Sequence, residues 1–113
     1  MTKYLISFDD GTMIIPDEDW PSVGEAAHKV VFEAMDAAVW VFGGGLESQR
    51  TSIVDTDGTV TDGPYPETKE VIGGFVVLNL PSREVALEWA AKFAAACRCK
   101  QEVREIMPDP SIE

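Results

Sequence analysis

One histidine and a few charged residues are the side chains of this sequence best suited to chemistry. His28 is the only histidine, and an imidazole titrates close to neutral pH, which suits it to proton transfer. Asp62, Lys69 and Glu70 lie together in a later stretch. A carboxylate could orient the imidazole, and a lysine between carboxylates could hold an acidic substrate group as a point charge. We therefore expect His28 and Asp62 to be catalytic, and Lys69 and Glu70 to bind the substrate.

A structural interpretation stands beside each of these assignments. A single histidine in a helix is more often structural or exposed than catalytic. Asp62 and Lys69 could equally form an ion pair that holds their loop in shape and braces a dimer. For Pro64, Pro66 and the pair Gly73-Gly74 the structural role is favoured, because proline stiffens a chain and glycine lets another backbone approach closely.

The stretch that carries Asp62 is dense in conformationally special residues. It reads Asp-Gly-Pro-Tyr-Pro-Glu-Thr-Lys-Glu-Val-Ile-Gly-Gly-Phe over residues 62–75. It closely resembles the DGPF-type signature of the YCII-related (YciI-like) family, with Tyr65 in the position of the usual phenylalanine. The resemblance extends from Tyr4 to about Met107. It implies a dimeric α+β barrel.

The resemblance also implies a role for His28. Proteins of this family carry a histidine in the first helix, at a fixed distance before the glycine-containing end of the second strand, and His28 and Gly45 reproduce that separation. In those relatives an aspartate of an Asp-Pro step after the second helix completes a proposed catalytic dyad. Residues 92–97, taken as the corresponding region, contain no carboxylate. The dyad is therefore not reproduced there, and Asp62 or Glu70 could supply the partner.

Two classes of function remain open. The first is acid–base catalysis of lyase, isomerase or hydrolase type on a small organic substrate. The second is a non-catalytic ligand-binding or protein-interaction module, because DGPF-type domains are associated with sigma-factor-type transcription proteins. A pocket lined by His28 and a signature carboxylate would favour the first class, and an exposed His28 without a cavity would favour the second.

Bulk properties narrow the remaining possibilities. The 113 residues are expected to form one domain spanning 1–113. The net charge of −11 argues against binding to nucleic acid or to an anionic membrane surface. With no leader and no long apolar run, a cytoplasmic location is expected.

The two cysteines, Cys97 and Cys99, are expected to be reduced, and Cys97 is expected to pack on the apolar face of its helix. No metal-binding or nucleotide-binding motif occurs, so neither metal nor cofactor is expected.

Apolar periodicity and capping residues predict six main elements. A capping box begins the first helix at Ser22, and Ser82 caps the second. Asp57-Gly58 predicts a hairpin turn, and Gly43-Gly44-Gly45 is expected to end or bulge the second strand. The predicted elements are strands at 3–8, 39–42, 71–80 and 101–107, helices at about 23–37 and from 82 onward, and a small hairpin of 51–55 and 59–61. This order is the ferredoxin-like βαββαβ pattern, an antiparallel α+β sheet with both helices on one face.

The central strands predict a partner for this sheet. A sheet with one solvated face should alternate apolar and polar residues. Residues 39–42 and 75–78 are instead apolar at every position. Two helices cover only one face, so a second copy of the chain is the simplest cover for the other. We therefore expect a homodimer, with a small molecule as a further possible partner.

Overall fold

The computed structural model describes residues 1–47, 51–63 and 72–113. It is an α+β fold in which four strands form an antiparallel sheet of order β2-β5-β1-β6. This is the strand order of a ferredoxin-like fold and confirms the predicted class. The elements are β1 (Thr2–Asp9), η1 (Asp10–Thr12), η2 (Asp17–Asp19), α1 (Trp20–Asp36), β2 (Trp40–Gly45), β3 (Ser52–Val54), β4 (Val60–Asp62), β5 (Ile72–Leu80), α2 (Arg83–Cys97) and β6 (Glu102–Glu105).

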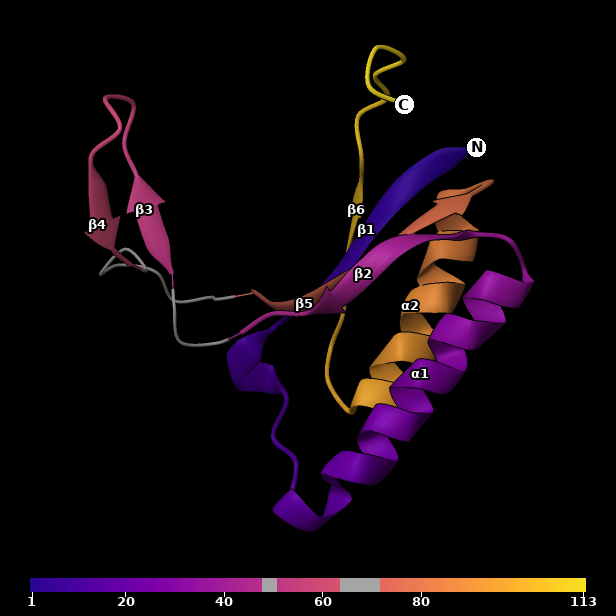
Figure 1. Ribbon diagram of the computed structural model, residues 1–113. Helices are drawn as coiled ribbons and strands as arrows, with labels where there is room; N and C mark the ends of the chain where they lie inside the picture. Colours follow the sequence, from indigo (N-terminus) through magenta and orange to yellow (C-terminus); the bar gives the residue numbers. More distant parts are fainter. Residues whose placement is uncertain (48–50, 64–71) are drawn as a thin grey trace.

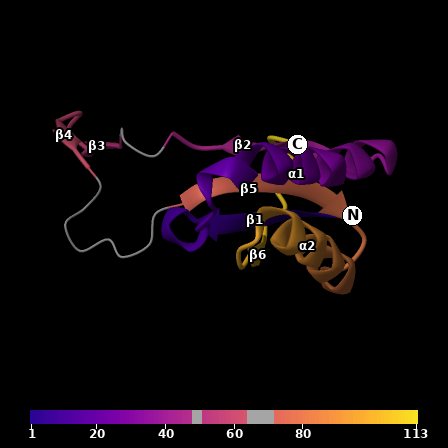
Figure 2. The ribbon, with the colours of Figure 1, turned by 90° about the horizontal axis from the view of Figure 1, so that it is seen from below.

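Both helices lie side by side on one face of the sheet (Figure 1). In Figure 2 α1 runs beside the β2 edge and α2 beside the β6 edge. The core between the layers takes alternate residues of the two central strands, which point to the same face. Its buried members are Tyr4, Ile6, Leu78 and Leu80 from the sheet and Val30, Ala34, Ala86, Ala90 and Phe93 from the helices. Neither described helix is long and apolar enough to cross a membrane.

The opposite face of the sheet carries no helix and is apolar at its centre. The register pairs Leu5 with Val77 and Phe42 with Val77, and paired residues point to the same side. Phe75 belongs to this side as well, and its ring lies 5.9 Å from that of Phe42. The Phe42 side chain is 63% exposed. We call the surface of Leu5, Phe42, Phe75 and Val77 the helix-free face.

The start of α1 differs from the prediction. The helix begins at Trp20, not Val23, and its N-cap, Asp19, makes no side-chain capping bond. Ser22 therefore does not cap it; its hydroxyl donates to the Asp19 carbonyl at 2.9 Å. The physical reason is Pro21, whose missing N–H costs nothing in the first turn, and the turn η2, which leads directly into the helix.

The second strand is also longer than expected. Gly43, Gly44 and Gly45 were expected to end or bulge it, but they continue the ladder and pair with Val76, Phe75 and Gly74. The register shifts between Trp40 and Phe42 instead. At Gly43 a Cβ would lie 2.6 Å from the Phe75 carbonyl oxygen and 2.8 Å from the Val76 Cα. Only glycine fits where the two backbones approach this closely.

The predicted cap of the second helix and the predicted hairpin are confirmed. Ser82 caps α2, accepting a hydrogen bond from the Val85 N–H at 3.2 Å. The hairpin forms from β3 and β4, and Gly58 takes the positive φ of 87° that its turn requires. This hairpin stands apart from the sheet in Figure 1.

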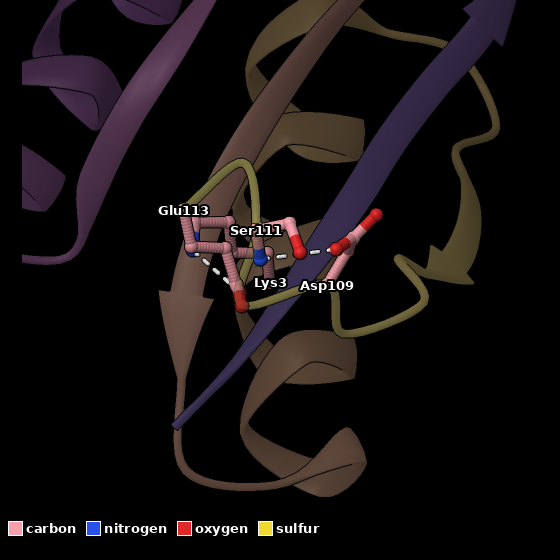
Figure 3. Close-up of polar contacts among 4 residues, drawn as sticks. All are labelled: Lys3, Asp109, Ser111 and Glu113. Carbon is pink, nitrogen blue, oxygen red and sulfur yellow. Dashed lines mark hydrogen bonds and ion pairs between the residues drawn. The ribbon is translucent and has the colours of Figure 1, made fainter.

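The last strand, β6, is shorter than predicted and ends at Glu105. The chain then folds back over β1, as Figure 3 shows. There Lys3 Nζ pairs with Glu113 Oε1 at 3.2 Å, and the Ser111 N–H donates to Asp109 at 3.1 Å. Exposed ion pairs of this kind contribute little to stability. This contact therefore adds little to the free energy of unfolding.

The glycines of β2 give a direct test of this packing. Gly43→Ala should lower the free energy of unfolding by about 1–3 kcal/mol, because the methyl group meets backbone atoms that cannot move alone. Gly45→Ala is the matched control: nothing lies within 4 Å of a Cβ there, so its effect should stay within about 0.5 kcal/mol. Urea denaturation of both variants checks this, and equal effects would contradict it.

Candidate functional site

A cleft of about 600 Å³ opens between α1, η1 and the helix-covered side of the sheet. Its walls are mainly aromatic, aliphatic and glycine residues. We call it the aromatic cleft and define it by Phe8, Trp20, Trp40 and Phe93, with His28, Asp10 and Gln101 as its polar side chains. Phe93 is buried at the inner end, and Trp20, 44% exposed, stands toward solvent. The cleft thus connects the core with solvent.

Glycines keep this cleft open. Gly43, Gly44 and Gly45 all line it, so one wall is backbone. Across from β2, the Phe8 ring lies against Gly73 and Gly74, where a Cβ would come within 2.7 and 2.8 Å of ring carbons. A Cβ on Gly73 would also meet the Asp10 Cα at 2.9 Å. These two glycines therefore set the positions of Phe8 and of the turn that carries Asp10.

His28 lies on α1 and lines the aromatic cleft, although its side chain is exposed. Its imidazole stacks on Phe32 one helical turn later, with ring centroids 6.1 Å apart and an angle of 22° between planes. Among the described residues, no carboxylate makes a hydrogen bond or ion pair with His28. The structure therefore shows an exposed imidazole beside a cavity. The cavity is the feature expected for an enzyme, and the exposed imidazole is the feature expected for a binding module.

The other predicted site residues are not gathered around His28. Asp62 is exposed at the end of β4, in the separate hairpin, and does not line the aromatic cleft. Lys69 and Glu70 lie outside the described residues, as does most of the signature. The roles assigned to Asp62, Lys69 and Glu70 stay predictions.

The segment taken to correspond to the family's Asp-Pro step was placed wrongly along the chain. Residues 92–97 lie inside α2 rather than after it. The chain does contain an Asp-Pro step beyond that helix, Asp109-Pro110, in the tail after β6. Asp109 accepts the hydrogen bond from the Ser111 N–H (Figure 3) and does not line the aromatic cleft. Neither segment brings a carboxylate to His28.

Sequence reasoning missed Asp10 and Gln101. Both line the cleft, yet neither was assigned a role from the sequence. The signal that could have found Asp10 is its place two residues after Phe8, because residues two apart in an extended chain point to the same side. Gln101 donates from Nε2 to the Cys99 carbonyl at 3.4 Å and to its sulfur at 3.5 Å, and no sequence motif marks it.

The two cysteines are free, and Cys97 lines the aromatic cleft. Burial raises the pKa of the Cys97 thiol above its ordinary value, and the neighbouring Cys99 adds to that effect. Burial also raises the pKa of Cys99, against the opposing hydrogen bonds of Thr12 and Gln101. A thiolate is the reactive form, so both sites disfavour nucleophilic chemistry. This agrees with the packing role predicted for Cys97.

Comparison with protein families gives a match over most of the chain. The model of the YCII-related domain matches residues 22–108, more than half of the chain. The matched region contains most of α1 with His28, both central glycine segments and α2, and it confirms the family resemblance read from the signature. No curated protein matches the sequence.

Thiol labelling tests the chemistry assigned to the cysteines. At pH 8, iodoacetamide should alkylate Cys97 and Cys99 more slowly in the folded protein than in urea, because the raised pKa values keep the thiols protonated. The rates should climb as the pH rises, and Cys97, 8% exposed, should be the slower. Peptide mass spectrometry resolves the two sites. Faster labelling of Cys97 in the folded chain would overturn this assignment.

Proposed function

This chain belongs to the YCII-related family, and we propose that it binds a small organic molecule in the aromatic cleft. One observation carries the proposal: the concavity of about 600 Å³ combines aromatic walls with only a few polar side chains. Small-molecule sites in proteins have this composition and size. The ligand would lie between the Trp20 and Trp40 walls, with its polar group toward His28, Asp10 or Gln101.

A second candidate function is acid–base catalysis on that molecule, favoured by the place of His28. The only histidine of the chain stands on the cleft wall, where a bound molecule could exchange a proton with it. Proton abstraction would suit an elimination or an isomerisation, and activation of water would suit a hydrolysis. Asp62 as the partner of His28 stays a prediction, and Asp10 is a carboxylate that lines the same cleft.

We further propose that the chain is a homodimer joined through the helix-free face. Phe42 is more than half exposed, and Leu5, Phe75 and Val77 are partly exposed beside it. An apolar surface of this kind on an otherwise acidic molecule supports association. A second copy offers the same apolar centre by two-fold symmetry. Lys3 on β1 and Glu102 and Arg104 on β6 flank this centre on one side and would form a polar rim there.

Filling the cleft tests the binding proposal. Gly45→Leu places a large side chain where no atom lies within 4 Å of the Cβ, so the protein should stay folded while binding is lost. Gly11→Ala is the control, because Gly11 is equally open but does not line the cleft. A fragment screen of small aromatic compounds by isothermal titration calorimetry compares them. Hits that bind the Gly45→Leu variant as well as the wild type would contradict the proposal.

Substitution of His28 distinguishes the two candidate functions. Substituting His28→Gln keeps a polar side chain but removes the titratable group. If the cleft only binds, affinity for screened ligands should change less than about threefold, well under the tenfold that 1.4 kcal/mol represents. If His28 exchanges protons, turnover of a substrate found among the hits should fall about 10²–10⁴-fold, and Asp62→Asn should reproduce part of that loss only if Asp62 is the partner.

Sedimentation equilibrium tests the dimer. The wild type should sediment at twice its chain mass of 12.4 kDa. Phe42→Glu should give a folded monomer, because it buries a charge within the proposed interface. Phe32→Glu is matched in chemistry and exposure, at 57% against 63%, but lies on α1, so it should stay dimeric. A monomeric wild type, or identical behaviour of the two variants, would refute the interface.

A further inference from the structure

We infer that the aromatic cleft selects a ligand with a positive charge, an amine or a quaternary ammonium group attached to an apolar or aromatic body. This inference rests on the proposed function, because it names the ligand class of the same cleft. It concerns the sign of the ligand's charge, which neither the family nor the cavity volume specifies.

The first support is the aromatic lining. Phe8, Trp20 and Trp40 come from β1, α1 and β2 and meet at one cleft. The faces of aromatic rings carry negative electrostatic potential and attract cations, with tryptophan the strongest. Trp20 is partly exposed and Trp40 partly buried, so a ligand passing from solvent to the core would contact both. Such a lining accepts an apolar body and an ammonium group in one pocket.

The second support is the charge of the cleft. Of its described lining residues, Asp10 is the single carboxylate, and none is lysine or arginine. Among these described residues an acidic ligand would meet no fixed positive charge and would face Asp10. A cationic ligand would gain an ion pair instead. Asp10 is exposed and lies two residues after Phe8, at the start of η1, so its carboxylate stands where the aromatic wall reaches solvent.

The charged residues near the cleft also favour a cationic ligand. The turn η2, which leads into Trp20, consists of Asp17, Glu18 and Asp19. Only Asp19 of these three is neutralised in the described structure, by Arg98 at 2.8 Å. With a net charge of −11 on the chain, the field near the cleft favours approach of cations and opposes anions. The described part of the cleft therefore disfavours a carboxylate-bearing substrate, while the role assigned to Lys69 stays a prediction.

Three probes of one shape test the inference: 2-phenylethylamine, 2-phenylethanol and 3-phenylpropionate, each titrated by calorimetry at neutral pH into the full chain. The amine should bind at least about tenfold more tightly than the alcohol, since a cation–π contact and one ion pair together contribute on the order of that factor. The anion should bind most weakly. Added salt should reduce the preference for the amine, because it screens charges at an exposed site.

Two variants locate the effect. Asp10→Asn should bring the amine close to the affinity of the alcohol and leave the alcohol unchanged. Asp9→Asn removes the same charge from the neighbouring residue, which does not line the cleft, and should keep most of the preference. Equal loss in both variants, or no loss in either, would overturn the assignment to this cleft.

The failures of the two proposals are distinguishable. If the alcohol or the anion binds the wild type as tightly as the amine, and Gly45→Leu abolishes that binding, the charge selectivity is wrong and the binding function stands. If none of the three probes binds at millimolar concentration, both the charge selectivity and the proposed aromatic-ligand site are refuted.

Discussion

The close pairing of the glycine-rich ends of β2 and β5 is the constraint on which the rest of this structure depends. Gly43 leaves no space for a Cβ against the Phe75 carbonyl, so glycine is what lets β2 join the sheet edge after its register shift. On β5, Gly73 and Gly74 accept the Phe8 ring and the backbone of Asp10 in the same way. These contacts extend the sheet and hold the turn above it. Because glycine contributes no side chain, they also leave a hollow beside α1 instead of filled core.

The two faces of the sheet follow from that arrangement. On one face the central strands meet both helices and form the core, except where the glycines leave the aromatic cleft. On the other face the same strands present Leu5, Phe42, Phe75 and Val77 without a helix to cover them. Apolar surface near a polar rim is typical of association sites, whereas an apolar cavity with few polar groups is typical of ligand sites. The dimer and the ligand site are thus proposed for opposite faces, and of the residues that define the helix-free face, Phe75 also lines the cleft.

The sequence predicted the fold well because its strongest signals are local. The hairpin turn at Asp57-Gly58, the cap at Ser82 and the strand-helix order depend on nearby residues, and all were confirmed. The start of α1 was wrong because a capping-box pattern at Ser22 competed with Pro21, and proline decided the first turn. The glycines of β2 look like a strand end in sequence but are paired through β5, a contact between distant segments. The site was the least predictable part, since Asp10 and Gln101 reach the cleft only through tertiary packing, and His28 was found through its chemistry rather than its surroundings.

The central claim is that the hollow left by the glycines is a ligand site, and the three tryptophan indole signals test it most directly. Trp20 and Trp40 line the cleft, whereas Trp89 lies on α2 with the Lys92 ammonium 4.9 Å from its ring centroid and does not line it. In a ¹H-¹⁵N spectrum recorded while a small aromatic amine is added, the indole signals of Trp20 and Trp40 should move together and saturate, and that of Trp89 should stay in place. Uniform movement of all three signals, or none up to millimolar amine, would contradict the account.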